Sequence, residues 1–299
     1  MTGDLAYEVV VPHRCLLGEG PVWDAQMNTV CWVDIPNGEI HEFSLTDNGF
    51  RTMAIKDKIG AIALCTDGRF LAALKSGFAF IDRQNGKIKL IDHPEAHLPG
   101  NRFNDGKCDA VGRFWAGTMA LSEETGAGSL YMIENDLSAT VKIKGVSISN
   151  GLAWSPDNKI MYYIDTPTFE VVAYDYDIQT GNIANKRVAI QIPEKEGFPD
   201  GMTIDMDGML WIAHWGGSQV ARWDPDTGAK LLTVQLPVAH VTSCTFGGTH
   251  LNDLYITSAR VGLSEKQLIE QPLAGSLFVV RNCGFRGMET AAFHYKNNI

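Results

Sequence analysis

Short apolar runs alternate with polar turns along the whole chain. Runs such as 30–33, 160–164 and 209–213 are rich in Val, Ile, Tyr, Trp and Met. Turn sequences such as 155–158 and 224–228 separate them, and their Asp, Asn, Pro and Gly residues favour chain reversal. This pattern predicts antiparallel β-strands joined by short turns. No segment keeps a helical period over three turns, and 265–270 comes nearest to doing so.

The apolar runs recur in six units, most of which open with a polar residue followed by glycine. The opening residues are Glu19, Ile59, Asp105, Asn150, Asp200 and Thr242. Their spacing of about 40 to 50 residues, with four strands in each unit, is typical of a propeller blade. We therefore predict an all-β fold, a six-bladed β-propeller with four-stranded antiparallel blades, formed by residues 1–299 as one domain. The alternative, an array of β-sandwiches, would not put the polar–glycine pair at the same phase in every unit.

The opening residues form a column that points to chemistry. In a propeller the first strand of each blade lines the central channel, so equivalent positions face one another around the axis. Five of the six opening residues carry side-chain oxygen atoms, although their flanking sequences are apolar. Such oxygen donors suit calcium, magnesium or manganese. Asp-Gly and Asn-Gly are also common turn signals, but five such residues in phase favour a metal site over turns.

A second polar cluster, 100–106, leads into the third unit. Arg102 and Asn104 offer a planar guanidinium group and an amide near the channel mouth. These groups suit a ligand with hydroxyl or carbonyl groups, whereas the alternative is an arginine on a solvated loop. His214 and Trp215, at the end of a strand, are candidate wall residues. The other seven histidines show no metal-ligand spacing, so we interpret them as structural or surface residues.

Composition narrows the possible partners and the compartment. The net charge of −10 argues against nucleic acid and anionic membrane surfaces, because both require a basic footprint. No run approaches the roughly 20 apolar residues of a membrane span, and the N-terminus does not resemble a signal peptide. Six scattered cysteines without a CxxC pair predict buried free thiols rather than a disulfide framework. We therefore expect a cytoplasmic protein and, by default, a monomer.

The tryptophans and the absent motifs complete this interpretation. Five tryptophans fall on predicted blade strands and are expected in the core: Trp23, Trp32, Trp115, Trp154 and Trp211. The chain has no Gly-x-Ser-x-Gly sequence, which removes local support for a serine hydrolase. It also has no Walker or dinucleotide-binding glycine fingerprint.

Five motifs resemble the SMP-30/gluconolactonase/regucalcin family in its order and spacing. They are 17–23 (LGEGPVW), 101–107 (NRFNDGK), 116–119 (AGTM), 149–152 (SNGL) and 199–202 (PDGM). The resemblance spans about Gly18 to Val280, and 257–260 with 271–275 is similar to the bacterial sugar-lactonase branch. It implies a metal-dependent lactone hydrolase on a six-bladed propeller.

The resemblance also implies roles for particular residues. Its metal ligands correspond to Glu19, Asn150 and Asp200, and its substrate-contacting pair corresponds to Arg102 and Asn104. The family's acidic residue shortly after the AGTM motif has no clean counterpart, because Leu121-Ser122 come before Glu123-Glu124.

The leading hypothesis is hydrolysis of a sugar (aldono-) lactone to its aldonic acid, with Asp200 as the general base. The expected cofactor is one divalent metal ion, which leaves Ca, Mg, Mn, Zn and Fe(II) open. The alternatives are a non-enzymatic calcium-binding propeller, a lactonase or esterase for non-sugar substrates, and a propeller scaffold for protein interactions. We expect the loops 93–100 and 121–128 to select the lactone.

Overall fold

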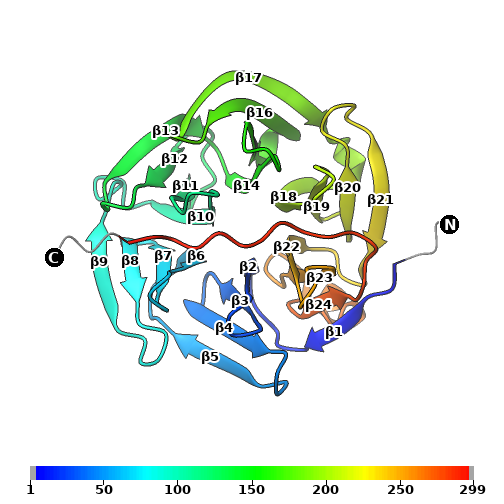
Figure 1. Cartoon of the computed structure of the whole chain (residues 1–299). Helices are drawn as coiled ribbons and strands as arrows, with labels where there is room; N and C mark the ends of the chain where they lie inside the picture. The colour runs from blue at the N-terminus through cyan, green and yellow to red at the C-terminus, as the bar shows by residue number, and fades with distance from the viewer. Residues whose placement is uncertain (1–4, 296–299) are drawn as a thin grey trace.

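The computed structural model describes residues 5–295, and its 24 strands form six four-stranded sheets around a central channel (Figure 1). The innermost strands are β2 (Gly18–Asp24), β6 (Ile59–Leu64), β10 (Asn101–Cys108), β14 (Ser149–Trp154), β18 (Phe198–Ile204) and β22 (Val241–Gly247). The second strands are β3 (Thr29–Asp34), β7 (Phe70–Leu74), β11 (Phe114–Ala120), β15 (Ile160–Asp165), β19 (Leu210–Trp215) and β23 (Asp253–Ser258).

The outer half of each blade completes the ring. The third strands are β4 (Glu39–Ser44), β8 (Gly77–Ile81), β12 (Gly128–Ile133), β16 (Glu170–Asp177), β20 (Gln219–Trp223) and β24 (Leu277–Val280). The outermost strands are β5 (Phe50–Ala54), β9 (Ile88–Asp92), β13 (Ala139–Val146), β17 (Asn182–Gln191), β21 (Lys230–Gln235) and β1 (Glu8–Val11). Between residues 5 and 295, helical structure is limited to η1 (Thr166–Thr168), η2 (Glu194–Glu196) and α1 (Glu265–Glu270). The predicted six-bladed propeller is confirmed.

The two ends of the described chain close this ring. β1 pairs antiparallel with β24, so the last blade takes its outermost strand from the N-terminus. Such a pairing joins the first and last segments of the chain and leaves no free blade edge at the junction. The sequence repeats did not indicate this exchange, because β1 lies before the first repeat unit.

Burial follows the position of each strand in its blade. Every residue of β7 is buried, whereas four of the five residues of β9 are exposed. Apolar side chains of neighbouring blades pack together, as Leu74 and Ile62 of the second blade do with Val33 of the first. The five tryptophans predicted for the core and all six cysteines are buried, and the cysteines are unpaired.

Glycine lets the innermost strands approach one another closely. A Cβ atom on Gly60 would lie 2.5 Å from the carbonyl oxygen of Phe103 on the next innermost strand. A Cβ atom on Gly151 would lie 2.8 Å from the carbonyl oxygen of Asp200. The column of glycines seen in the sequence therefore reflects how narrow the ring is at the channel.

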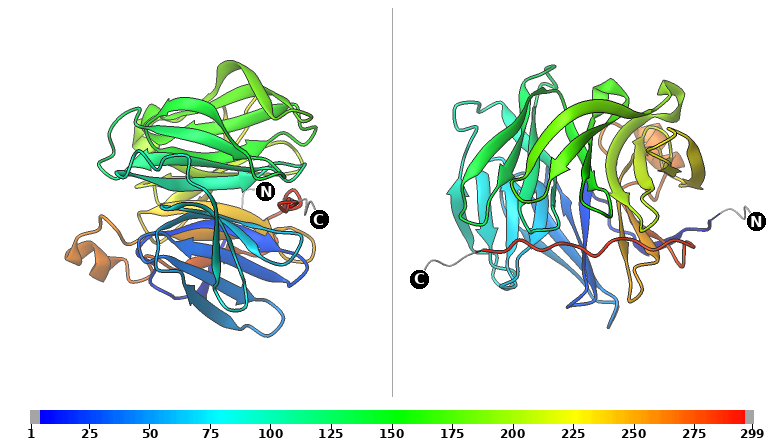
Figure 2. Two further views of the ribbon diagram at one scale, coloured as in Figure 1. Left: turned by 90° about the vertical axis from the view of Figure 1, so that its left-hand side faces the viewer. Right: turned by 45° about the horizontal axis from the view of Figure 1, so that its top comes forward.

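The segment 284–295 crosses one end of the channel, where the innermost strands end (Figures 1 and 2). It is held by backbone hydrogen bonds at both sides of the ring, from Met206 N to Arg286 O (2.8 Å) and from Thr66 N to Phe293 O (3.1 Å). Its residues 288–291 line a cavity of about 130 Å³ that Asp105 and Lys107 also line. We name this the closed end, and the end where the innermost strands begin the entrance. Within residues 5–295, no helix is long and apolar enough to cross a membrane.

Candidate metal and substrate site

A β-bulge lies at the column position of every innermost strand. In the four strands that carry acidic or amide residues, the register shifts between Glu19 and Val22, Phe103 and Gly106, Ser149 and Leu152, and Pro199 and Met202. A bulge places two residues opposite one and redirects a side chain that regular pleating would point elsewhere. The bulges therefore aim polar side chains of an otherwise apolar strand at the channel.

Three side chains from the first, fourth and fifth blades meet near the entrance. Glu19, Asn150 and Asp200 are 5%, 3% and 5% exposed. Burial and the nearby charge of Asp200 raise the pKa of the Glu19 carboxyl well above its usual range. Asp200 has its pKa raised well above the usual range by burial and then by Asp105, while a hydrogen bond with Asn150 opposes the shift. The structure therefore brings together the three residues that the resemblance marks as ligands.

Asp105 adds a third carboxylate that the sequence had left without a role. It is buried, its Oδ1 accepts a hydrogen bond from Gly106 N at 2.7 Å, and burial raises its pKa. Lys107 opposes that rise, and the Lys107 ammonium donates to Met202 O at 2.6 Å. The charge of Asp105 also raises the pKa of Glu19 and of Asp200, so buried carboxylates repel one another here, and such a setting favours a bound cation.

The amide of Asn150 provides a direct test of whether the site fits a metal ion. Its Nδ2 donates to Thr166 Oγ1 at 3.0 Å, and that hydroxyl donates to Pro199 O at 2.9 Å. This chain fixes the amide orientation and leaves Asn150 Oδ1 buried without a hydrogen-bond partner among residues 5–295. Buried polar atoms are rarely left unpaired. An unpaired oxygen beside carboxylates is what a hard divalent cation requires, so these residues fit the implied metal.

Arg102 and Asn104 form a connected pair beside this site. Arg102 Nη1 donates to Asn104 Oδ1 at 2.6 Å and to Phe103 O at 3.0 Å. Asn104 Nδ2 in turn donates to Ser149 O on the next innermost strand, at 2.8 Å. Burial lowers the pKa of Arg102 to about 10, and the charges of Glu19, Glu123 and Asp200 act against this change. Arg102 therefore stays cationic at neutral pH and faces the acidic cluster.

The two loops expected to select a substrate are joined by one buried carboxylate. Glu95, in the loop 93–100, accepts hydrogen bonds from Thr118 Oγ1 (2.8 Å), Tyr131 (3.0 Å) and Asn101 Nδ2 (3.0 Å). Asn101 Nδ2 also donates to Ala127 O, in the loop that follows β11. This link could not be predicted from the sequence, because Glu95 lies in a polar segment with no motif of its own.

Glu123 is a candidate for the family's acidic residue after the AGTM motif, for which the sequence alone offered no clean counterpart. Its charge lies close enough to Arg102 to affect the pKa of that side chain. The residue has a φ of 58°, a left-handed conformation that is uncommon outside glycine and asparagine. An acidic side chain therefore reaches the vicinity of Arg102 although it stands later in the sequence than the family pattern would put it.

The two candidate wall residues have different surroundings. His214 is fully buried within its own blade, where Nδ1 contacts Glu196 O at 3.1 Å and the ring stacks on Trp223. Trp215 stacks on His240 with the ring centroids 3.8 Å apart. It follows that His214 supports its blade, whereas Trp215 and His240 form an aromatic pair where β19 ends and β22 begins.

Comparisons with known proteins agree with these features. A sequence model of the SMP-30/Gluconolactonase/LRE-like region matches residues 17–260. The chain is 39% identical to regucalcin of Bos taurus, with 94% of this chain and 96% of that protein covered. It is 41% identical to YvrE of Bacillus subtilis, a candidate sugar lactone lactonase by name, with 89% and 91% covered.

A solved structure described as a calcium-binding protein, regucalcin, from Agrobacterium tumefaciens superposes with a TM-score of 0.91. The two chains are 31% identical, and the superposition covers 98% of each. The extent of the family match, together with the shared propeller, shows that this chain belongs to the SMP-30/gluconolactonase family.

Proposed function

We propose that this protein is a metal-dependent hydrolase that opens a sugar (aldono-) lactone to the corresponding aldonic acid. The observation that carries the proposal is the unpaired, buried Oδ1 of Asn150 among the carboxylates of Glu19 and Asp200. The name of the family includes gluconolactonase, and the relative YvrE is named as a candidate sugar lactone lactonase. Both names support this type of reaction. The ester bond broken is that of the lactone ring.

Glu19, Asn150 and Asp200 would hold the metal ion. A divalent cation at such a site stabilises negative charge that develops on a carbonyl oxygen and favours ionisation of a nearby water. Two carboxylates and one amide leave room around a cation for water and substrate, in contrast to a closed structural site.

Asp200 acts as the general base. One carboxylate oxygen holds the attacking water and takes its proton as the water oxygen bonds to the lactone carbonyl carbon. The ring oxygen then leaves and receives a proton, so that one water molecule is added across the ester bond.

Arg102 and Asn104 orient the substrate. The hydrogen bonds from Arg102 to Phe103 O and Asn104 Oδ1 both use Nη1, so its other guanidinium nitrogens can donate to a hydroxyl-rich ligand. Asn104 is held by Arg102 and by Ser149 O, so the pair forms a fixed polar surface. A prealigned surface reduces the entropy that a sugar lactone loses on binding. Glu123 supplies an additional acceptor for sugar hydroxyl groups.

The second candidate function is calcium binding without catalysis, since the Agrobacterium tumefaciens relative is described as a calcium-binding protein. A protein that only binds a cation has no use for a partly buried arginine beside the ligands, because its charge opposes the cation. The cationic Arg102 therefore favours the enzyme. Hydrolysis of non-sugar esters remains a variant of the same proposal. The six unpaired thiols agree with a cytoplasmic location.

The test is hydrolysis of a panel of aldonolactones followed by acid release. Metal is first removed with a chelator and then restored one ion at a time. We expect activity to be lost with chelation and regained with one or more of Ca, Mg, Mn, Zn and Fe(II). Asp200→Asn should reduce turnover by roughly 100- to 10,000-fold, the range for loss of a general base. The exposed Asp175→Asn, whose partner is Arg187, is the matched control.

Two results would contradict the proposal. Turnover by Asp200→Asn near the wild-type rate, with metal bound, would remove Asp200 from the mechanism. Absence of hydrolysis with every lactone and ion, in a protein that still binds metal tightly, would favour the calcium-binding function.

A further inference from the structure

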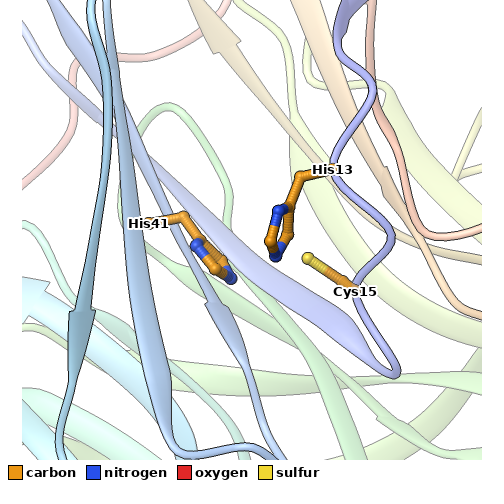
Figure 3. A group of neighbouring side chains, drawn as sticks. All are labelled: His13, Cys15 and His41. Carbon is orange, nitrogen blue, oxygen red and sulfur yellow. The ribbon is translucent and has the colours of Figure 1, made fainter.

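A second group of metal-ligating side chains lies away from the channel site, where the closing N-terminal segment meets the first blade. His13 and Cys15 belong to the segment 12–17, which connects β1 to β2, and His41 lies in β4. One ligand atom of each, an imidazole nitrogen or the thiol sulfur, lies within 4.8 Å of the other two. Figure 3 shows the two rings and the sulfur directed toward one another.

The surroundings of His41 point to a missing partner. Its side chain is fully buried, and Nδ1 lies 2.9 Å from Thr52 Oγ1. Nε2, on the opposite side of the ring, has no hydrogen-bond partner among residues 5–295. The carboxylate oxygen Glu39 Oε2 lies 3.7 Å from Nε2, which is too far for a hydrogen bond. A buried ring nitrogen in this situation is unfavourable whether or not it carries the proton.

A cation bound between His13, Cys15 and His41 would give the unpaired ring nitrogen of His41 a partner. If Thr52 accepts the Nδ1 proton, Nε2 keeps a lone pair that can bind a cation, and the hydroxyl fixes the tautomer as a second partner of a ligating histidine does. The ring centroids of His13 and His41 are 4.6 Å apart with the planes inclined by 54°. This inclination allows the two rings to turn a nitrogen toward a shared position, which parallel stacking would not.

The donor set indicates the type of ion. Two imidazole nitrogens and one thiolate suit zinc and similar borderline-soft transition metals, not calcium or magnesium. Glu39 lies near enough to supply a fourth, oxygen ligand after a small side-chain movement. Asp34 does not fit this role as well, because its carboxylate already accepts from Leu16 N at 2.7 Å and Leu17 N at 3.2 Å.

We propose that His13, Cys15 and His41 form a second, structural metal site for zinc or a chemically similar divalent transition-metal ion. Binding displaces the thiol proton to solvent, and no electron is transferred. The site joins the segment 12–17 to β4 of the first blade, whereas β1 on the same segment pairs with β24 of the last blade. A metal here would fasten the junction at which the ring closes.

The probe is cobalt(II), which replaces zinc and gives an intense thiolate-to-metal charge-transfer band in the near ultraviolet when a cysteine binds it. The background variant is Glu19→Gln, which weakens the channel site, so that the bound cobalt reports on the second site. We expect about one cobalt per chain with this band. Cys15→Ser and His13→Ala should each abolish the band or weaken cobalt binding at least tenfold.

Matched controls separate the proposed site from other thiols and histidines. Cys283→Ser changes another buried, unpaired cysteine, and His250→Ala changes an exposed histidine. Both should keep the band. A band that persists in Cys15→Ser, or that never appears in folded Glu19→Gln protein, would overturn the proposal.

A stability measurement provides an independent test. Zinc should raise the thermal midpoint of Glu19→Gln in a concentration-dependent way, because it binds the folded chain. The rise should be absent from the Glu19→Gln/His13→Ala double variant. His13 is only partly buried in the unchanged protein, so its loss is compatible with folding. An equal rise in both proteins would assign the zinc effect to another part of the molecule and refute the site.

Discussion

Removing one hydroxyl should weaken metal binding without touching a ligand. Thr166→Val deletes an oxygen that accepts from Asn150 Nδ2 and donates to Pro199 O. The amide of Asn150 then loses the contact that keeps Oδ1 directed at the candidate metal position. Replacement of groups that orient metal ligands typically costs 10- to 100-fold in affinity. This range corresponds to about 1.4 to 2.8 kcal/mol.

The same substitution has a separate effect on folding. Two buried, neutral hydrogen bonds contribute about 1 kcal/mol each, so the metal-free protein should lose about 2 kcal/mol of stability. Valine nearly matches threonine in shape, which limits any change in packing. Thr257→Val is the matched control, because Thr257 is also buried but its hydroxyl contacts Thr242 and Ser243 O.

The assay is competition of each metal-free protein against a fluorescent chelator, with urea unfolding measured in parallel. Thr166→Val should lose both stability and metal affinity, and Thr257→Val should lose stability alone. At saturating metal, Thr166→Val should regain a turnover number near that of the wild type. Wild-type metal affinity in a folded Thr166→Val protein would refute the role assigned to Asn150 Oδ1.

Three further predictions concern substrate binding, pH and the closed end. Arg102→Lys should lower kcat/KM by about 10- to 100-fold, chiefly through KM, because the bond to Asn104 Oδ1 is charge-assisted. The control Arg69→Lys, on the surface, should leave the kinetics unchanged. Equal kinetics for both variants would contradict the role assigned to Arg102. Burial lowers the pKa of His214 from 6.5 to about 4. Between these pH values the unfolded chain binds a proton at His214 that the folded chain does not, so stability falls as the pH drops from 6.5 toward 4. In His214→Phe the slope of unfolding free energy against pH in that window should be smaller by up to about 1.4 kcal/mol per pH unit, and an unchanged slope would show that His214 does not titrate there. Phe293→Ala, in the segment across the closed end, should lower the free energy of unfolding in urea by about 3 kcal/mol and leave metal affinity unchanged. The reason is that the fully buried Phe293 ring packs near Phe80. A loss below about 1 kcal/mol would mean that the segment adds little to the stability of the fold.

The repeat pattern in the sequence was sufficient to predict the architecture. Six apolar units in phase indicate six similar sheets, because strands and turns depend on neighbouring residues. The polar column within those units also identified Glu19, Asn150 and Asp200 as channel residues, since equivalent positions of a closed ring must face its axis. Both inferences depend only on period and phase, which are properties of the chain itself.

Other features depend on contacts between residues far apart in the chain. Asp105 and Lys107 line the cavity at the closed end together with residues 288–291 only because the blades close around the channel. No pattern in the sequence indicates that the segment 284–295 lines this cavity. Glu95 connects two loops through Asn101, which also donates to Ala127 O, although Glu95 lies in a polar segment without a motif. No local pattern encodes such contacts.

The histidines show this limit most clearly. His13 and His41 have no metal-ligand spacing in the sequence, and we interpreted them as structural or surface residues. The folded chain brings both beside Cys15, because the N-terminal strand crosses to the last blade before the chain returns to build the first. The sequence by itself determined the repeating strands and the residues that face the axis. Only the tertiary structure decided which side chains from different blades and segments meet, since ring closure sets those distances and local propensity does not.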